Sequence, residues 1–163
     1  MAEPCQRART LFAEAVQLQR EQQGLSKASL AFKAKISPNT LHLIENKNGN
    51  VRVDTIGQLA YALRVDPCSF FSDCSYPKPT ARRIKNLRHV VAVNIRMNRA
   101  DLGLVQSQMN SDLQMAKGHL GLIERSAPNL SLDTIEQIAI YLTIPIEALL
   151  WDSLMNCRTQ SLS

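Results

Sequence analysis

Apolar residues recur about every three to four positions along most of the chain, which is the spacing of helices that bury one face. In the first such stretch the inward positions are Leu11, Ala15, Val16 and Leu18. Gly24 follows this stretch, and glycine commonly ends a helix because it tolerates a left-handed backbone. A later stretch over residues 53–63 has the same spacing, with Ile56, Leu59, Ala60 and Leu63 inward. The pattern predicts an all-α fold.

Capping residues mark where the helices between these two stretches begin. Ser26 precedes a stretch that buries Leu30, and Ser37 precedes one in which Pro38 occupies the first turn. Serine is a favoured N-cap because its hydroxyl accepts a hydrogen bond from the first turn, and proline is tolerated there because that turn needs no N–H from it. With a last short turn that buries Phe70, five short helices are predicted up to about residue 71.

The chain repeats itself with an offset of 79 residues, which is the separation of Leu41 from Leu120. From these two positions the sequence reads LHLIENKNGNVRVDTIGQLAYAL and LGLIERSAPNLSLDTIEQIAIYL. The register holds without a gap over residues 11–71, and it aligns Arg20 with Arg99. A conserved period of this kind indicates a duplicated structural unit.

We therefore expect two tandem five-helix domains, at residues 1–72 and 83–152, with a flexible tail at residues 153–163. A short linker at residues 73–82 joins them, because the stretch SDCSYPKPT contains two prolines and no helical pattern. The pattern turns helical again at Ala81, which predicts that the first helix of the second copy is extended at its N-terminus.

The net charge of +5 is distributed unevenly along the chain. Residues 1–76 carry nine Lys or Arg against seven acidic residues, and residues 77–90 carry five basic residues and no acid. Residues 91–163 carry five basic residues against seven acidic ones. The basic character therefore lies in the first copy and the connector, where it favours an anionic partner such as nucleic acid.

Composition restricts the remaining classes. With 45% hydrophobic and 20% charged residues the chain has the balance of a globular protein, and no stretch approaches the about 18 apolar residues of a membrane span. The four cysteines lack metal-type spacing, so we expect reduced thiols, no bound metal and no cofactor. They are Cys5, Cys68, Cys74 and Cys157. These features predict a cytoplasmic protein that does not bind membranes.

The first copy resembles the Cro and lambda-repressor-like (Xre) helix-turn-helix family. The family pattern combines a Ser-capped helix with Leu-Ala, a Ser-capped recognition helix ending in Ile-Glu, and a final helix with Ala-x-x-Leu. The matching residues are Leu25, Ser26, Leu30, Ala31, Ser37, Ile44, Glu45, Ala60 and Leu63. The resemblance implies a sequence-specific regulator of transcription that binds double-stranded DNA, most often as a repressor, and no enzymatic activity.

In that family the second helix of the motif enters the major groove, and its N-terminal side chains meet the base edges. The candidates for base contacts here are Ser37, Pro38, Asn39, Thr40, His42 and Leu43. Asn39 can pair bidentately with adenine, and the Thr40 methyl group suits thymine. Each of these side chains has a plain alternative as a solvated helix residue, and Leu43 has one as half-buried packing.

Other residues are expected to contact the phosphates of the DNA backbone or to stabilise the fold. The phosphate candidates are Lys27, Lys47, Asn48, Asn50 and Arg52, with Arg82, Arg83 and Lys85 in the connector. Arg88 follows them, and all four connector residues have the alternative of a solvated helix face. The resemblance implies structural ion pairs of Arg20 with Glu45 and of Arg99 with Glu124.

The second copy departs from the family pattern, and its role stays open between DNA reading and dimerisation. Its DNA candidates are Gln106, Lys117, Gly118 and His119. Against them, Asn110 takes a small-residue position, Gln114 replaces the turn glycine, and Gly118 and Gly121 weaken the expected recognition helix. Its apolar set, offered as core plus partner surface, is Met97, Leu102, Leu104, Met109 and Met115.

Two functions remain in competition. The first is a DNA-binding repressor, expected as a homodimer on an operator with inverted half-sites. The second is a protein-interaction module, either an antitoxin or an anti-activator, that uses the same scaffold to hold a protein partner through the second domain.

Overall fold

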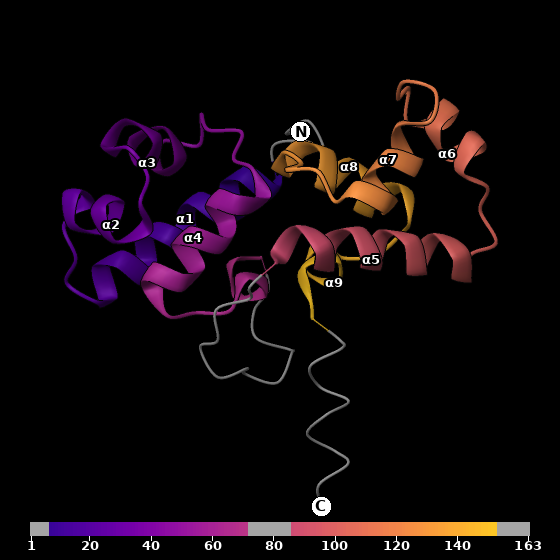
Figure 1. Ribbon diagram of the computed structural model, residues 1–163. Helices are drawn as coiled ribbons and strands as arrows, with labels where there is room; N and C mark the ends of the chain where they lie inside the picture. Colours follow the sequence, from indigo (N-terminus) through magenta and orange to yellow (C-terminus); the bar gives the residue numbers. More distant parts are fainter. Residues whose placement is uncertain (1–6, 72–85, 153–163) are drawn as a thin grey trace, which may run out of the picture.

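The computed structural model describes residues 7–71 and 86–152 (Figure 1). The first of these segments forms α1 (Arg7–Gln22), α2 (Lys27–Ala34), α3 (Pro38–Glu45), α4 (Val53–Leu63) and the 3-10 helix η2 (Pro67–Phe70). The second forms α5 (Leu87–Asp101), α6 (Gln106–Asp112), α7 (His119–Ser126), α8 (Leu132–Tyr141) and α9 (Ile146–Leu150). All regular elements in the described residues are helical, which confirms the predicted all-α class.

The predicted caps are present at the start of α2 and α3. The Ser26 hydroxyl accepts a hydrogen bond from the Ser29 N–H at 3.1 Å, and the Ser37 hydroxyl accepts one from the Thr40 N–H at 3.0 Å. Gly24 follows α1 with a φ of +63°, a left-handed backbone conformation that favours glycine. These local signals were therefore sufficient to set the helix boundaries of the first segment.

Two sequence-based expectations about individual positions are wrong. Leu18 is 54% exposed, since the buried face of α1 passes through Phe12 and Val16 instead. Gly118 lies before α7 as its N-cap with a φ of +77°, so it does not weaken the helix interior. The predicted N-terminal extension of the first helix of the second segment falls on residues 81–85, which lie outside the described residues, and the described helix begins at Leu87 after its N-cap Asn86.

The two segments repeat one another in structure as well as in sequence. With the offset of 79 residues, each of the elements α5 to α9 begins within two residues of its counterpart among α1, α2, α3, α4 and η2. In Figure 1, α2 and α3 lie at one end and α6 and α7 at the other, while η2 and α9 lie between them. The predicted linker at residues 73–82 and the tail at residues 153–163 fall outside the described residues.

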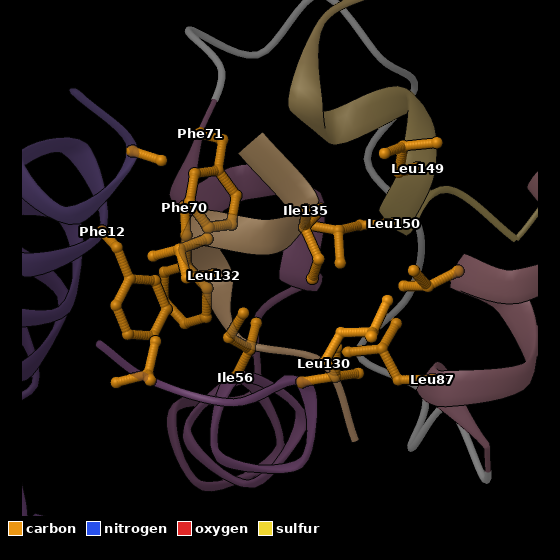
Figure 2. Packing of buried hydrophobic residues seen from close by; sticks show 14 of the residues in the cluster. Phe12, Ile56, Phe70, Phe71, Leu87, Leu130, Leu132, Ile135, Leu149 and Leu150 are labelled. Carbon is orange, nitrogen blue, oxygen red and sulfur yellow. The ribbon is translucent and has the colours of Figure 1, made fainter. Parts of the chain in front are cut away.

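A single apolar cluster joins the two sets of helices, which are α1 to η2 (the first set) and α5 to α9 (the second set) (Figure 2). Phe12 of α1 packs edge-on against Phe70, with ring centroids 5.0 Å apart, and stacks on Phe71 at 5.7 Å. Leu132 of α8, which is fully buried, belongs to the same cluster. Burial of apolar side chains is the main favourable term in folding, so each set of helices contributes directly to the stability of the other.

The backbone of the two sets meets at the residues just before α4 and α8. The Val53 N–H donates to the Leu130 carbonyl at 3.0 Å, and the Leu132 N–H donates to the Val51 carbonyl at 2.7 Å. Between them Arg52 and Ser131 form an isolated antiparallel bridge. The offset of 79 residues relates Val53 to Leu132 and Val51 to Leu130, so the two hydrogen bonds are equivalent and run in opposite directions. The same relation is found where two identical partners meet around a two-fold axis.

Side chains repeat the same reciprocal relation. Arg9 forms an ion pair with Asp133, and its counterpart Arg88 forms one with Asp54, the counterpart of Asp133. The hydrogen bonds from the two Nε atoms measure 2.7 and 2.6 Å. Cys68 also lies next to the residue that corresponds to it under the offset, Glu147, and its Sγ atom is 3.5 Å from the Glu147 carbonyl oxygen. An approximate two-fold axis therefore relates the two sets of helices within one chain.

Candidate nucleic-acid interface

Helices α2 and α3 form the helix-turn-helix of the first set. Leu30 and Ala31 of α2 and Leu41 of α3 are buried against one another and the rest of the core. Lys35 ends α2 in the left-handed conformation, with a φ of +56°, and its N–H bonds back to the end of that helix. The short turn and the shared apolar faces fix α3 on the scaffold, so that its outer face is held in place.

The predicted base-contact residues of α3 come together on that outer face. Ser37, Pro38, Asn39, His42 and Leu43 are exposed and Thr40 is half-buried. Ser37 caps the helix and its hydroxyl lies 2.7 Å from that of Thr40, so both hydroxyls already have partners. Within the part of the chain that the structure describes, the Asn39 amide has no hydrogen-bond partner and is free to meet a base.

His42 and Leu43, the other two outward side chains of α3, are not simply solvated. The His42 Nε2 atom lies 2.9 Å from Nδ2 of Asn46, one turn further along, which orients the imidazole ring. Leu43 is 41% exposed, so it is only in part a packing residue. An apolar side chain at this exposure next to a polar one suits contact with a thymine methyl group.

A buried ion pair joins the helix-turn-helix to α1. The Arg20 Nε atom donates to Oε1 of Glu45 at 2.6 Å, and Lys27 Nζ lies 3.0 Å from the other carboxylate oxygen. Burial by itself would raise the pKa of the Glu45 carboxyl, but hydrogen bonds and charge from Arg20 and Lys27 outweigh it and lower that pKa. Glu45 is therefore a charged structural anchor, and Lys27 is held at the start of α2 beside it.

The second set has the same buried ion pair, with Gln106 in the place of Lys27. Arg99 Nε donates to Glu124 Oε1 at 2.6 Å, and Gln106 Nε2 donates to Oε2 at 2.7 Å. Burial alone would raise the pKa of Glu124, and the bonds from Arg99 and Gln106 lower it. A Cβ on Gly121 would lie 3.1 Å from the side-chain Oε1 atom of Gln106, so the glycine makes room for this side chain.

The phosphate candidates of the first copy divide into two groups. Lys27 and Asn48 are exposed near the motif, and Lys47 is exposed as well, with Nζ 2.7 Å from Glu14 Oε1. Asn50 and Arg52 instead contact the second set: Asn50 Oδ1 accepts from the Asp133 N–H at 3.3 Å, and Arg52 donates to the Asn129 carbonyl at 2.9 Å. Arg82, Arg83 and Lys85 lie outside the described residues.

The candidates of the second copy lie at the start of α7. Lys117 and Gly118 are exposed and His119 is half-buried. Asn110 is buried, and its Oδ1 accepts the Leu120 N–H at 2.9 Å, so this departure from the family pattern stabilises the start of α7. Gln114 adopts a φ of +52°, and its counterpart Lys35 also has a left-handed backbone, so neither copy has glycine at this turn.

The apolar set named for the second copy is mostly core. Met109 is fully buried, and Leu104 and Met115 are partly buried against the cluster. Met97 and Leu102 are 48% and 55% exposed, next to Val105 at 63%. Met97, Leu102 and Val105 lie near the turn between α5 and α6, and their exposed apolar side chains offer a surface to a partner.

Sequence reasoning missed the residues that join the two sets of helices. Their signal was present, because Arg9 and Arg88 are identical under the offset, as are Asp54 and Asp133. A position with no such signal is Glu136, which is 6% exposed and accepts the Ala8 N–H at 2.9 Å. Its other oxygen has no hydrogen-bond partner within the described residues.

Glu136 gives a pH-dependent prediction. Burial raises the pKa of this carboxyl, the Ala8 N–H opposes the rise, and Asp133 adds to it. Because the folded-state pKa is raised, stability should fall as pH rises from the ordinary value of 4.5 through the folded pKa. Glu136→Gln should therefore be more stable than the wild type at neutral pH and equal to it below pH 4.5, as measured by urea unfolding at both pH values.

The exposed Glu14→Gln serves as the control and should show no comparable trend. If the wild type instead became more stable than Glu136→Gln as pH rises, the charged form of Glu136 would not be destabilised by burial, and the prediction would be wrong.

Within the described ranges no helix is long and apolar enough to cross a membrane, and no three His, Cys, Asp or Glu side chains are grouped to hold a metal ion. Residues 16–70 match the family model described as helix-turn-helix. No match was found among curated proteins. Among solved structures, a hypothetical transcription factor from Neisseria is 25% identical with a TM-score of 0.42, over 46% of this chain and 86% of that one.

Proposed function

We propose that the chain is a sequence-specific DNA-binding regulator that represses transcription, because residues 16–70 match the helix-turn-helix family model. The observation that carries the proposal is the exposed outer face of α3, on which the Asn39 amide is free of partners among the described residues. Residues 26–52, around this face, hold five Lys or Arg and one acidic residue, Glu45, which is itself neutralised by Arg20. This surface suits a polyanion.

The reading step takes place in the major groove. With α3 in the groove, Asn39 accepts and donates one hydrogen bond each at the Hoogsteen edge of an adenine. Thr40 and Leu43 offer methyl groups to neighbouring thymines, and His42 lies one turn further into the helix. Ser37 and Pro38 keep the first turn of α3 rigid, so the position of Asn39 is set before DNA arrives.

Phosphate contacts supply affinity without sequence preference. Lys27, Lys47 and the exposed Asn48 flank α3 and are the side chains we assign to the DNA backbone. The ion pairs of the two lysines with Glu45 and Glu14 leave both lysines about half exposed, so a phosphate can replace or share these partners. Binding should weaken with salt because each neutralised phosphate releases counterions. Since its proposed partner is DNA, we propose that the protein acts on the nucleoid in the cytoplasm.

A second candidate function is the binding of a protein partner by the second set of helices. The exposed Met97, Leu102 and Val105 around the turn from α5 to α6 favour it, because neighbouring apolar side chains are a feature of contact surfaces. The segment over residues 105–131 also has two basic and two acidic residues, so it lacks the positive excess of the first set. A variant with all three changed to Ser separates the candidates, because DNA binding should survive it.

The test of the proposed function is a selection of duplexes from a randomised library by the full chain. Asn39→Ala should weaken binding to the selected duplex by roughly 5- to 150-fold and relax the preference for adenine at one position. A promoter that carries the selected site should be transcribed less when the wild-type chain is present.

Gln58→Ala is the matched control, an exposed amide on α4 away from the α3 face, and it should bind as the wild type does. Equal binding by wild type and Asn39→Ala would remove Asn39 from the reading surface. Failure of the wild-type chain to select any sequence would overturn the proposal itself.

A further inference from the structure

We propose that a single chain reads a whole operator, with α3 and α7 held on two unlike half-sites by the contact between the two sets of helices. This inference rests on the proposed function. In helix-turn-helix regulators that dimerise, a two-fold axis places two identical recognition helices on successive turns of one face of the DNA. Here the axis lies within one molecule, so the second recognition helix comes from the same chain as the first.

The contact between the sets has the reciprocity of a homodimer interface. Two backbone hydrogen bonds, two Arg–Asp ion pairs and two asparagine caps exchange places under the offset. The caps run from the Asp54 N–H to Asn129 Oδ1 at 3.1 Å and from the Asp133 N–H to Asn50 Oδ1 at 3.3 Å. Each set satisfies its partner-facing groups with the other set. Within the described residues this surface is therefore occupied inside one chain, and we propose one chain on the operator in place of the homodimer expected from the sequence.

The axis also fixes the relative direction of α3 and α7. Arg52 and Ser131 form the bridge between the sets and are equivalent positions under the offset, and each lies on the short connection that follows its recognition helix, α3 or α7. Two helices related by a two-fold axis lie at the same height along it, and Figure 1 shows α3 and α7 on the side away from η2 and α9. Both outer faces can therefore meet one duplex.

Specific differences at the contact favour pairing of unlike sets. Glu136 of α8 accepts the Ala8 N–H of α1, but at the related position Gly57 of α4 faces Leu87 of α5, whose Cδ2 lies 3.6 Å from the place of a Cβ. If two second sets paired, Glu136 would meet Leu87, and a buried carboxylate would face an apolar side chain. The contact is thus complementary between the first set and the second, within one chain.

The two reading faces carry different chemistry. Asn39 and Thr40 correspond to Gly118 and His119, and the neighbouring Pro38 corresponds to Lys117. A pair of identical half-sites would not satisfy both faces. The predicted operator is therefore an imperfect inverted repeat in which Asn39 specifies a base of the first half-site, and Lys117 and His119 contact the second with less discrimination.

The experiment uses the full chain and the duplex that it selects from a randomised library. Native mass spectrometry counts the chains bound to each duplex, and footprinting maps the bases that are protected. We expect one chain per duplex and two protected half-sites. Insertion of half a helical turn (about 5 base pairs) between them should lower the affinity by about 100-fold, because only one recognition helix can then engage.

Protein variants assign the two half-sites without disturbing the core. Asn39→Ala should change the protection of the first half-site, and the pair Lys117→Ala/His119→Ala that of the second. Two chains per duplex, a single protected half-site, or an insertion without effect would each overturn the inference and leave the proposed function standing. Absence of any selected sequence would overturn both.

Discussion

Arg20→Ala is expected to lower the free energy of unfolding by about 3 kcal/mol, because it leaves a buried carboxylate without its main partner. The Glu45 side chain is 3% exposed and Arg20 is 10% exposed, so water cannot replace the lost bonds. The same change also removes the hydrogen bond from Arg20 Nη1 to the Leu25 carbonyl at 3.0 Å, which closes the turn between α1 and α2. Urea unfolding at neutral pH measures the loss.

The pH dependence of this loss has a definite sign. Because the pKa of Glu45 is lowered in the folded protein, its contribution is complete above the ordinary value of 4.5 and disappears as pH falls through the folded pKa. The difference between the wild type and Arg20→Ala should shrink accordingly in acid. Lys47→Ala breaks an exposed ion pair and should cost less than about 1 kcal/mol. A similarly small cost for Arg20→Ala would contradict its role as an anchor.

Leu132→Ala should cost about 2–5 kcal/mol and destabilise both sets of helices together. Leu132 belongs to α8, but it is fully buried in the cluster that includes Phe12 and Phe70 of the first set (Figure 2). The cavity left by the missing methyl groups would lie where the sets meet. Amide hydrogen exchange should therefore show lower protection in α1 and α4 as well as in α8.

Ile140→Ala on the same helix is the matched control. Ile140 is 54% exposed, so its truncation should change stability by less than about 0.5 kcal/mol. If Leu132→Ala lowered the protection of α8 while leaving α1 and α4 unchanged, the two sets would be separate folding units, and the shared core would not hold them in a fixed relation.

The local structure of the first set could be read from the sequence because each of its signals acts over a few residues. Ser26 and Ser37 cap the helices that follow them, and Pro38 occupies a first turn that needs no donor from it. The spacing of Ile56 and Leu59 identifies the buried face of α4. The helix-turn-helix resemblance rests on the same residues, and the family match over residues 16–70 confirms it.

The contact between the sets was not predicted, since it depends on residues far apart in the sequence. Asn50 and Arg52 contact Asp133 and Asn129 of the second set, and nothing in the neighbouring sequence signals these contacts. The role of Glu136 likewise depends on a partner 128 residues away. Leu18 was misjudged because helical spacing alone does not say which of two adjacent apolar faces is covered.

The most direct test of the account is the ratio of Kd values for the selected duplex and a scrambled duplex of the same composition, measured over a salt series. We predict at least about 1,000-fold tighter binding to the selected duplex at physiological salt. Binding to both duplexes should weaken as salt rises, because both share the phosphate contacts. Equal affinity for the two duplexes at every salt concentration would contradict sequence-specific reading by α3 and would direct attention to a protein partner at Met97, Leu102 and Val105.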